Sequence, residues 1–220
     1  MFEHKKVDLG YQDLNCVTKP GGRKYTTPKG KAYPSITTVL SIKSKAGIEA
    51  WKKRVGEEEA NKISYRASQR GTAVHEMCEK YINNENHTLG FMPNIIGDFN
   101  QIKNILDTRI GKVYGQELPL YSDYLGVAGR VDCIAEFDGK LSVIDFKTSR
   151  KTKKKEWIEG YFQQETFYAI AWEERTKMPI TQLVTIISVD NDQPQVFVEH
   201  RDNWDKALIE TIKEYNEQNK

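Results

Sequence analysis

Cysteine is scarce in this sequence, and it contains no long apolar segment. The three cysteines, Cys16, Cys78 and Cys133, are far apart, which fits neither a disulfide framework nor the ligand spacing of a zinc or iron–sulfur cluster. The most apolar stretch, residues 183–189, is much shorter than the roughly 20 residues that cross a bilayer. The first fifteen residues lack the apolar core of a signal peptide and the Arg- and Ser-rich pattern of a transit peptide. We therefore expect no membrane partner and a reducing, cytoplasmic environment.

Positive charge is concentrated in two stretches, although the formal net charge is only +2. Residues 19–54 hold ten lysines and arginines against one acid, Glu49, and residues 150–155 hold five positive charges in six positions. Clustered basic residues on an otherwise acidic chain indicate a polyanionic partner that binds at particular places. A solvated surface is the alternative, and it is the simpler interpretation of the first stretch taken alone.

Apolar periodicity divides the chain into a helical N-terminal part and a mixed C-terminal part. Hydrophobic residues make up 38% of the chain, which is enough for a core. The first 33 residues predict loop with a short hairpin near Gly21 and Gly22, and Ser35 is suited to cap a following helix. Helices are expected at 48–54, 67–82, 94–109, 160–175 and 203–215, and strands at 113–121, 127–137, 141–147, 183–189 and 195–199. This order predicts a layered α/β fold.

The most informative local feature is the Asp138-Gly139 pair between two predicted strands, a strong signal for a two-residue hairpin. In a symmetric hairpin the numbers of paired residues sum to 277, so Asp132 is expected opposite Asp145. Arg130 is expected opposite Lys147 on the same face. Two facing carboxylates repel and need compensation. The group is therefore either a buried ion network or a divalent-cation site with Lys147 beside a metal-bound water.

A divalent cation would suit the paired carboxylates, because Mg²⁺ prefers hard oxygen ligands and keeps waters and substrate phosphate in its shell. Lys147 would then orient or deprotonate the attacking water, or stabilise charge at phosphorus. His75, on the predicted helix 67–82, is a candidate third ligand, and an imidazole makes Mn²⁺ as suitable as Mg²⁺. A packed or exposed histidine is the alternative interpretation.

Three further polar residues are candidates for the same site. Gln164 and Tyr168 are four residues apart and share one face of the predicted helix 160–175, where they would orient substrate phosphate or the lysine. Helix packing is the alternative, especially for Tyr168. Glu117, on the first predicted strand, either approaches the metal or is solvated.

Four short motifs occur in an order that resembles a known family. They are Arg70-Gly-Thr-x-x-His75-Glu76, Gly129-Arg-Val-Asp132, Ile144-Asp-Phe-Lys147-Thr-Ser149 and Gln164-x-x-x-Tyr168. Together they resemble the PD-(D/E)xK nuclease superfamily, more narrowly its RecB-type exonuclease branch with the mitochondrial genome maintenance exonucleases and their phage relatives. The Tyr33-Pro-Ser-Ile-Thr-Thr-Val-Leu40 segment and Trp51 add to this narrower similarity. The resemblance covers about residues 34–189.

This resemblance implies a restriction-endonuclease-like α/β fold with an αβββαβ core, a mixed central sheet and an N-terminal helical elaboration. Residues 1–33 would form a basic loop or hairpin extension, and residues 34–220 a single nuclease domain. Within that domain, 34–110 would be helical, 111–200 would hold the catalytic sheet and helix, and 201–220 would be the C-terminal helix.

The family pattern also implies roles for individual residues. The expected ligands of one or two Mg²⁺ or Mn²⁺ ions are His75, Asp132, Asp145 and the backbone carbonyl of Phe146. The catalytic lysine would be Lys147, and the expected catalytic set also includes Gln164, Tyr168 and Glu117. The residues expected to contact DNA are Ser35, Thr37, Arg70, Thr72, Arg130, Thr148, Ser149, Arg150, Lys151, Lys153, Lys154 and Lys155.

The implied activity is metal-dependent hydrolysis of DNA phosphodiesters, preferentially of single strands from an end, with single-stranded DNA or DNA ends as partner. The four-cysteine iron–sulfur cluster of some RecB-like relatives is not expected, since its ligands are missing. Without a transit peptide, a bacterial or phage-infected cell is a better setting than the mitochondrial matrix. A structure-selective endonuclease on the same core and a non-catalytic DNA-binding module are the alternatives.

Overall fold

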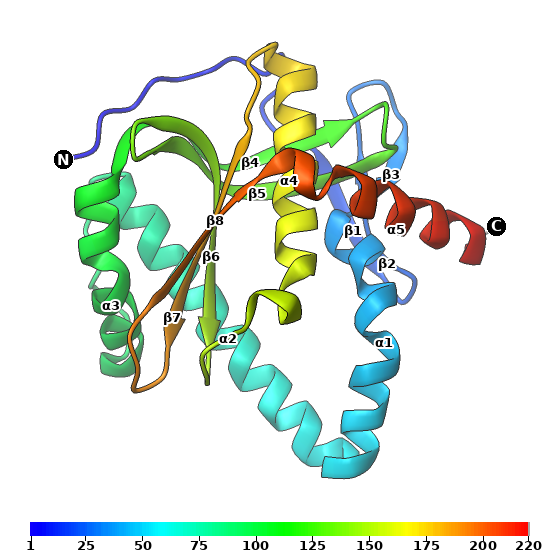
Figure 1. Ribbon diagram of the computed structural model, residues 1–220, viewed down its shortest axis with the longest axis horizontal. Coiled ribbons are helices and arrows are strands. Elements are labelled where there is room, and N and C mark those ends of the chain that lie inside the picture. The colour runs from blue at the N-terminus through cyan, green and yellow to red at the C-terminus, as the bar shows by residue number, and fades with distance from the viewer. Residues whose placement is uncertain (220) are drawn as a thin grey trace.

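A five-stranded mixed sheet forms the centre of the molecule (Figure 1). The computed structural model describes residues 1–219. The strand order is β4-β5-β6-β7-β8, in which β6 and β7 are parallel and the other neighbours antiparallel. The strands are β4 (Ile110–Ser122), β5 (Val127–Phe137), β6 (Lys140–Ser149), β7 (Gln182–Val189) and β8 (Gln195–His200). The expected mixed sheet is therefore confirmed, and its central strand β6 carries Asp145 and Lys147.

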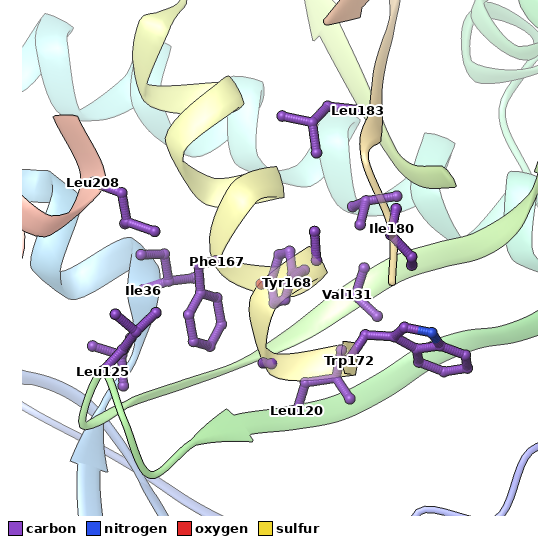
Figure 2. Close-up of a cluster of buried hydrophobic side chains, with 14 of the residues drawn as sticks. Ile36, Leu120, Leu125, Val131, Phe167, Tyr168, Trp172, Ile180, Leu183 and Leu208 are labelled. Carbon is purple, nitrogen blue, oxygen red and sulfur yellow. The ribbon is translucent and has the colours of Figure 1, made fainter. Parts of the chain in front are cut away.

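Helices cover both faces of this sheet. The helix α4 (Glu159–Thr176) and the C-terminal helix α5 (Asp205–Gln218) pack on one face, where Phe167, Trp172 and Leu183 belong to a fully buried cluster (Figure 2). The helix α3 (Pro93–Arg109) packs with α2 (Glu57–Ile82) on the other face. The order α3, β4 to β6, α4, β7 is the expected αβββαβ core. Within residues 1–219, none of the helices combines the length and the apolarity that crossing a bilayer requires.

Two long helices carry the N-terminal part away from the sheet and back. The helix α1 (Ile36–Val55) begins at Ser35, whose hydroxyl accepts a hydrogen bond from the amide of Thr38 at 3.1 Å. It ends at Gly56, whose φ of 92° lets the chain reverse into α2. Figure 1 shows the two helices meeting at a tip that stands clear of the sheet. The predicted helices 48–54 and 67–82 are parts of these longer ones, because the tip is exposed and has no apolar face for periodicity to detect.

A small antiparallel sheet precedes α1. It consists of β1 (Asn15–Lys19), β2 (Gly22–Thr26) and β3 (Ala32–Pro34), so the hairpin expected near Gly21 and Gly22 is present. Tyr25 is buried with Leu14 and Tyr121, which attaches this sheet to β4 and β5.

The hairpin between β5 and β6 has the predicted register up to one position. Asp138 and Gly139 both adopt positive φ, and the ladder runs from Phe137 opposite Lys140 to Cys133 opposite Ile144. There it stops, so the expected pairs Asp132 with Asp145 and Arg130 with Lys147 do not form and that prediction was wrong.

The strands separate because β5 changes partner at Asp132. Its carboxylate accepts a hydrogen bond from the amide of Phe146 at 2.9 Å, replacing the backbone contact that would have continued the ladder. On the other side of β5 the register is the same before and after Glu117, which places Glu117 opposite Asp132 with a φ of 47°. The positive φ of Glu117 and the end of the β5–β6 ladder therefore fall at the same level of the sheet, and the acidic side chains gather there.

Candidate active site

A pocket of about 760 Å³ lies where β5 and β6 separate. Its wall comes from α2, the start of α1, the strands β4 to β6, and α4. The predicted site residues that line it are Ser35, Thr37, Thr72, His75, Glu117, Arg130, Asp132, Lys147, Gln164 and Tyr168. The structure thus brings together residues from six separate segments of the chain.

His75, Glu117 and Asp132 form the tightest cluster in this pocket. One ligand atom from each lies within 4.8 Å of the others, and the Nδ1 atom of His75 is 3.3 Å from Oδ2 of Asp132. His75 comes from α2, Glu117 from β4 and Asp132 from β5. Glu117 therefore approaches the candidate metal position, which was one of the two open interpretations of this residue.

Asp145 and Lys147 form an ion pair on β6 beside this cluster. The Asp145 side chain is 2% exposed and that of Lys147 19% exposed. The side-chain amide of Gln164 donates to Oδ1 of Asp145 at 3.3 Å. The Nζ atom of Lys147 also lies 5.1 Å from the ring centroid of Tyr161, one turn before Gln164 on α4. The lysine is therefore held between a carboxylate and an aromatic ring.

The charges of the pocket perturb one another. Burial, together with the negative charge of Asp132, raises the pKa of Glu117 to about 7. Burial also raises the pKa of Asp145 to about 6, against the opposing effect of Lys147. Burial alone would raise the pKa of Asp132, but interactions led by the nearby His75 outweigh it and lower that pKa. Burial alone would lower the pKa of Lys147, but the carboxylates of Asp145 and Asp132 outweigh it and raise that pKa. Lys147 is therefore a cation over the whole physiological range.

These residues fit a divalent cation. The cluster of His75, Glu117 and Asp132 offers one imidazole nitrogen and two carboxylates, the donor set that Mg²⁺ and Mn²⁺ accept. Carboxylates buried close together raise one another's pKa, and a bound cation would relieve that repulsion. Asp145 lies outside the tight cluster and is engaged by Lys147, so its role as a ligand, like that of the Phe146 carbonyl, stays a prediction.

Tyr168 supports the strand that carries Asp132. Its buried hydroxyl donates to the backbone oxygen of Arg130 at 2.7 Å. A Cβ atom added to Gly129 would lie 2.9 Å from this hydroxyl, so the close approach of α4 to β5 requires glycine there. Arg130 itself binds Asp13 and the backbone oxygen of Glu117, not Lys147. Tyr168 is therefore a packing and hydrogen-bonding residue that fixes β5.

A second hollow, the basic groove, adjoins the pocket. It measures about 1020 Å³ and lies between α2 and the chain after β6. The predicted DNA-contacting residues that line it are Arg70, Thr148, Ser149, Arg150, Lys151 and Lys153, and Arg66 of α2 joins them. The pocket and the basic groove follow consecutive stretches of α2, with Gly71 on the pocket side and Arg70 on the groove side.

Not every predicted DNA-contacting residue is free for phosphate. Arg70 donates to both oxygens of Asp98 and also pairs with Asp190, so it ties α2 to α3 and to the end of β7. Lys155 pairs with Glu199 of β8. Lys154 stands over the ring of Trp157. The basic residues of this loop that line the basic groove are therefore Arg150, Lys151 and Lys153.

Two further residues of α4 belong to the site and were not predicted from the sequence. Tyr161 contacts Lys147, as described above, and Glu165 is fully buried with its carboxylate accepting from the hydroxyl of Thr185. Burial and the nearby Asp145 raise the pKa of Glu165 well above its usual value. The sequence carries no clear signal for Glu165, because it stands among the polar residues 163–166 and becomes buried only through the packing of α4 against β7.

Comparison with known proteins agrees with this geometry. Residues 98–219, more than half of the chain, match the model of the PD-(D/E)XK nuclease superfamily. Mitochondrial genome maintenance exonuclease 1 of Mus musculus is 33% identical over 131 residues, which cover 56% of this chain and 38% of the relative. The Homo sapiens protein of the same name is 31% identical over 130 residues, covering 54% and 38%. The chain thus matches less than two fifths of the length of these relatives.

A solved structure from Eubacterium rectale aligns with a TM-score of 0.43 at 11% identity, over 65% of this chain and 63% of that one. The chain belongs to the PD-(D/E)XK nuclease superfamily.

Proposed function

We propose that this chain is a metal-dependent DNA exonuclease that prefers single-stranded ends. The observation that carries the proposal is the convergence of Asp132, Lys147 and His75 on one pocket, with the buried Asp145 paired to Lys147 and a basic groove along the preceding stretch of α2. A carboxylate pair with a lysine cation suits hydrolysis of a phosphodiester, whose transition state carries extra negative charge at phosphorus. The exonuclease names of the relatives support the same activity.

The chain's own residues divide the work. Asp132, His75 and Glu117 would hold the cation, with Asp145 as a further ligand, and a bound cation would supply a more acidic water and neutralise phosphate charge. Lys147 stays protonated beside Asp145, so it is suited to stabilise charge at phosphorus and not to accept the proton of the water. Gln164 fixes the Asp145 carboxylate, and Tyr168 fixes β5.

The preference for a single strand rests on the shape and charge of the surroundings. The residues of α2 that line the two hollows run from Glu59 to Glu79, a helical length of about 30 Å. Arg66, Arg150 and Lys151 face the groove side of that path, and the last turn of α1 adds Lys52, Lys53 and Arg54 near the helical tip. A flexible strand would follow this path with its phosphates toward the basic residues.

The test compares linear with circular single-stranded DNA of the same sequence, each incubated with the purified protein in Mg²⁺, in Mn²⁺ and in chelator. The proposal expects degradation of the linear DNA alone, and only with metal. Cutting of the circles would show an endonuclease instead. Tight binding without cutting in either metal would show a non-catalytic binding module.

A further inference from the structure

Trp157 is exposed to solvent in a place where packing does not explain it. Its relative exposure is 67%, whereas Trp172 is fully buried and Trp51 and Trp204 are half-buried. It contributes to none of the hydrophobic clusters found among residues 1–219. Large exposed aromatic side chains are typical of binding surfaces, because an indole offers much contact area with little rotational freedom.

The backbone holds this indole firmly. Trp157 ends a short 3₁₀ helix, η1 (Lys155–Trp157), and its amide donates to the carbonyl of Lys154 at 3.0 Å. The next residue, Ile158, is 2% exposed and packs with Phe162 beneath the start of α4. The Nζ atom of Lys154 lies over the indole, 5.4 Å from its centroid. The ring is thus presented on a fixed turn with a cation over one face.

Trp157 also lies between the two regions that the proposed activity uses. The chain before it, with Arg150, Lys151 and Lys153, lines the basic groove. The chain after it enters α4, where Tyr161 contacts the catalytic-lysine candidate Lys147. In Figure 1 the turn of η1 sits at the end of α4 that faces the helices α1 and α2. Trp157 itself lines neither hollow, so a strand would reach this turn by continuing past Lys153 at the end of the basic groove.

We propose that Trp157 is a stacking platform for one base of single-stranded DNA, a subsite outside the catalytic pocket. The base lies on the face of the indole opposite Lys154, and the Lys154 ammonium pairs with the adjoining phosphate. This subsite rests on the proposed function, since it needs a single strand that runs from Lys147 toward the basic groove. It contributes to binding of the strand and leaves the chemical step to the pocket.

The test measures binding of a fluorescent single-stranded oligonucleotide in chelator, where no cutting occurs. Trp157→Ala is expected to weaken binding about five- to tenfold, because stacking on one aromatic ring is lost. Trp157→Phe is expected to restore most of the affinity. Tyr124→Ala removes a comparably exposed aromatic from the turn between β4 and β5, which is not continuous with the basic loop that lines the groove, and is expected to change nothing. Unlike loss of a phosphate contact, loss of stacking should leave the dependence of affinity on salt unchanged.

A series of oligonucleotides with one abasic site at successive positions locates the contact. With the wild-type protein, an abasic site at one or two positions should weaken binding. With Trp157→Ala, an abasic site at the same positions should weaken binding no further, because the missing base and the missing indole remove the same interaction. If the affinity of Trp157→Ala is within twofold of wild type, or if its abasic profile is the same as that of wild type, the stacking subsite is wrong. Cleavage by the wild-type protein would in that case leave the nuclease proposal standing. A wild-type protein that neither binds nor cuts the strand overturns both.

Discussion

The raised pKa of Glu117 makes a quantitative prediction for the metal-free protein. Its carboxyl is buried near Asp132, and its pKa lies at about 7 in the folded state. In the unfolded chain it titrates near the ordinary value of about 4.3. A folded-state pKa above the unfolded one means that the protonated group favours folding at low pH, and this contribution is lost as the pH rises through about 7. Glu117→Gln removes the titration and keeps the shape.

The size of the effect follows from the shift. Roughly 2.7 pKa units correspond to about 3.7 kcal/mol at about 1.36 kcal/mol per unit. Glu117 is only partly buried, so solvent screening reduces this to about 1–2 kcal/mol. For a chain of this length that is a Tm difference of about 3–6 °C. Glu117→Gln should therefore melt higher than wild type at pH 8 in chelator.

The assay is thermal unfolding in chelator between pH 5 and pH 8. The difference between variant and wild type should shrink as the pH falls below 7 and be small at pH 5. Glu76→Gln alters an exposed acid in the wall of the same pocket and serves as the matched control. Added Mn²⁺ should stabilise wild type more than Glu117→Gln, since a ligand is missing from the variant. A Glu117→Gln protein with the Tm of wild type at every pH would show that burial of this carboxyl does not raise its pKa.

Two further predictions concern the lysines. Lys147→Ala should reduce the single-turnover rate of cleavage by about 10² to 10⁴-fold, with little change in metal affinity measured by calorimetry. Lys140→Ala, at the exposed end of the same strand, should leave the cleavage rate unchanged. A rate loss under tenfold for Lys147→Ala would contradict the catalytic role of this lysine. Joint replacement of Arg150, Lys151 and Lys153 by glutamine should flatten the plot of log affinity for single-stranded DNA against log salt by up to about 2 in slope, and an unchanged slope would mean that this loop is merely a solvated surface.

The local pattern of the sequence was enough to predict the hairpin but not where it opens. Asp138-Gly139 specifies the turn, and the turn specifies the register as far as Cys133. At the end of the ladder, Glu117 of β4 adopts a positive φ and the Phe146 amide of β6 donates to the carboxylate of Asp132. These are contacts among three strands, and a count along two strands cannot include them.

For the site residues too, the sequence predicts some features and tertiary packing decides the others. Asp132, Asp145 and Lys147 stand out from their neighbours because each interrupts an apolar strand. Tyr161 gains its place only when α4 docks on β6. Arg70 carries a charge that suits phosphate, yet Asp98, 28 residues later, binds it instead. Sequence pattern thus predicts which residues are chemically unusual, whereas their partners depend on tertiary packing.

If this site cleaves DNA through Asp145 and a divalent cation, the decisive measurement is single-turnover cleavage of an end-labelled single strand in Mn²⁺. It compares wild type with Asp145→Asn and with Asp138→Asn, an exposed acid at the turn of the same hairpin. Asp145→Asn is expected to lose cleavage while binding the strand in chelator at least as tightly as wild type, and Asp138→Asn is expected to keep both activities. Undiminished cleavage by Asp145→Asn would show that Asp145 takes no part in the reaction.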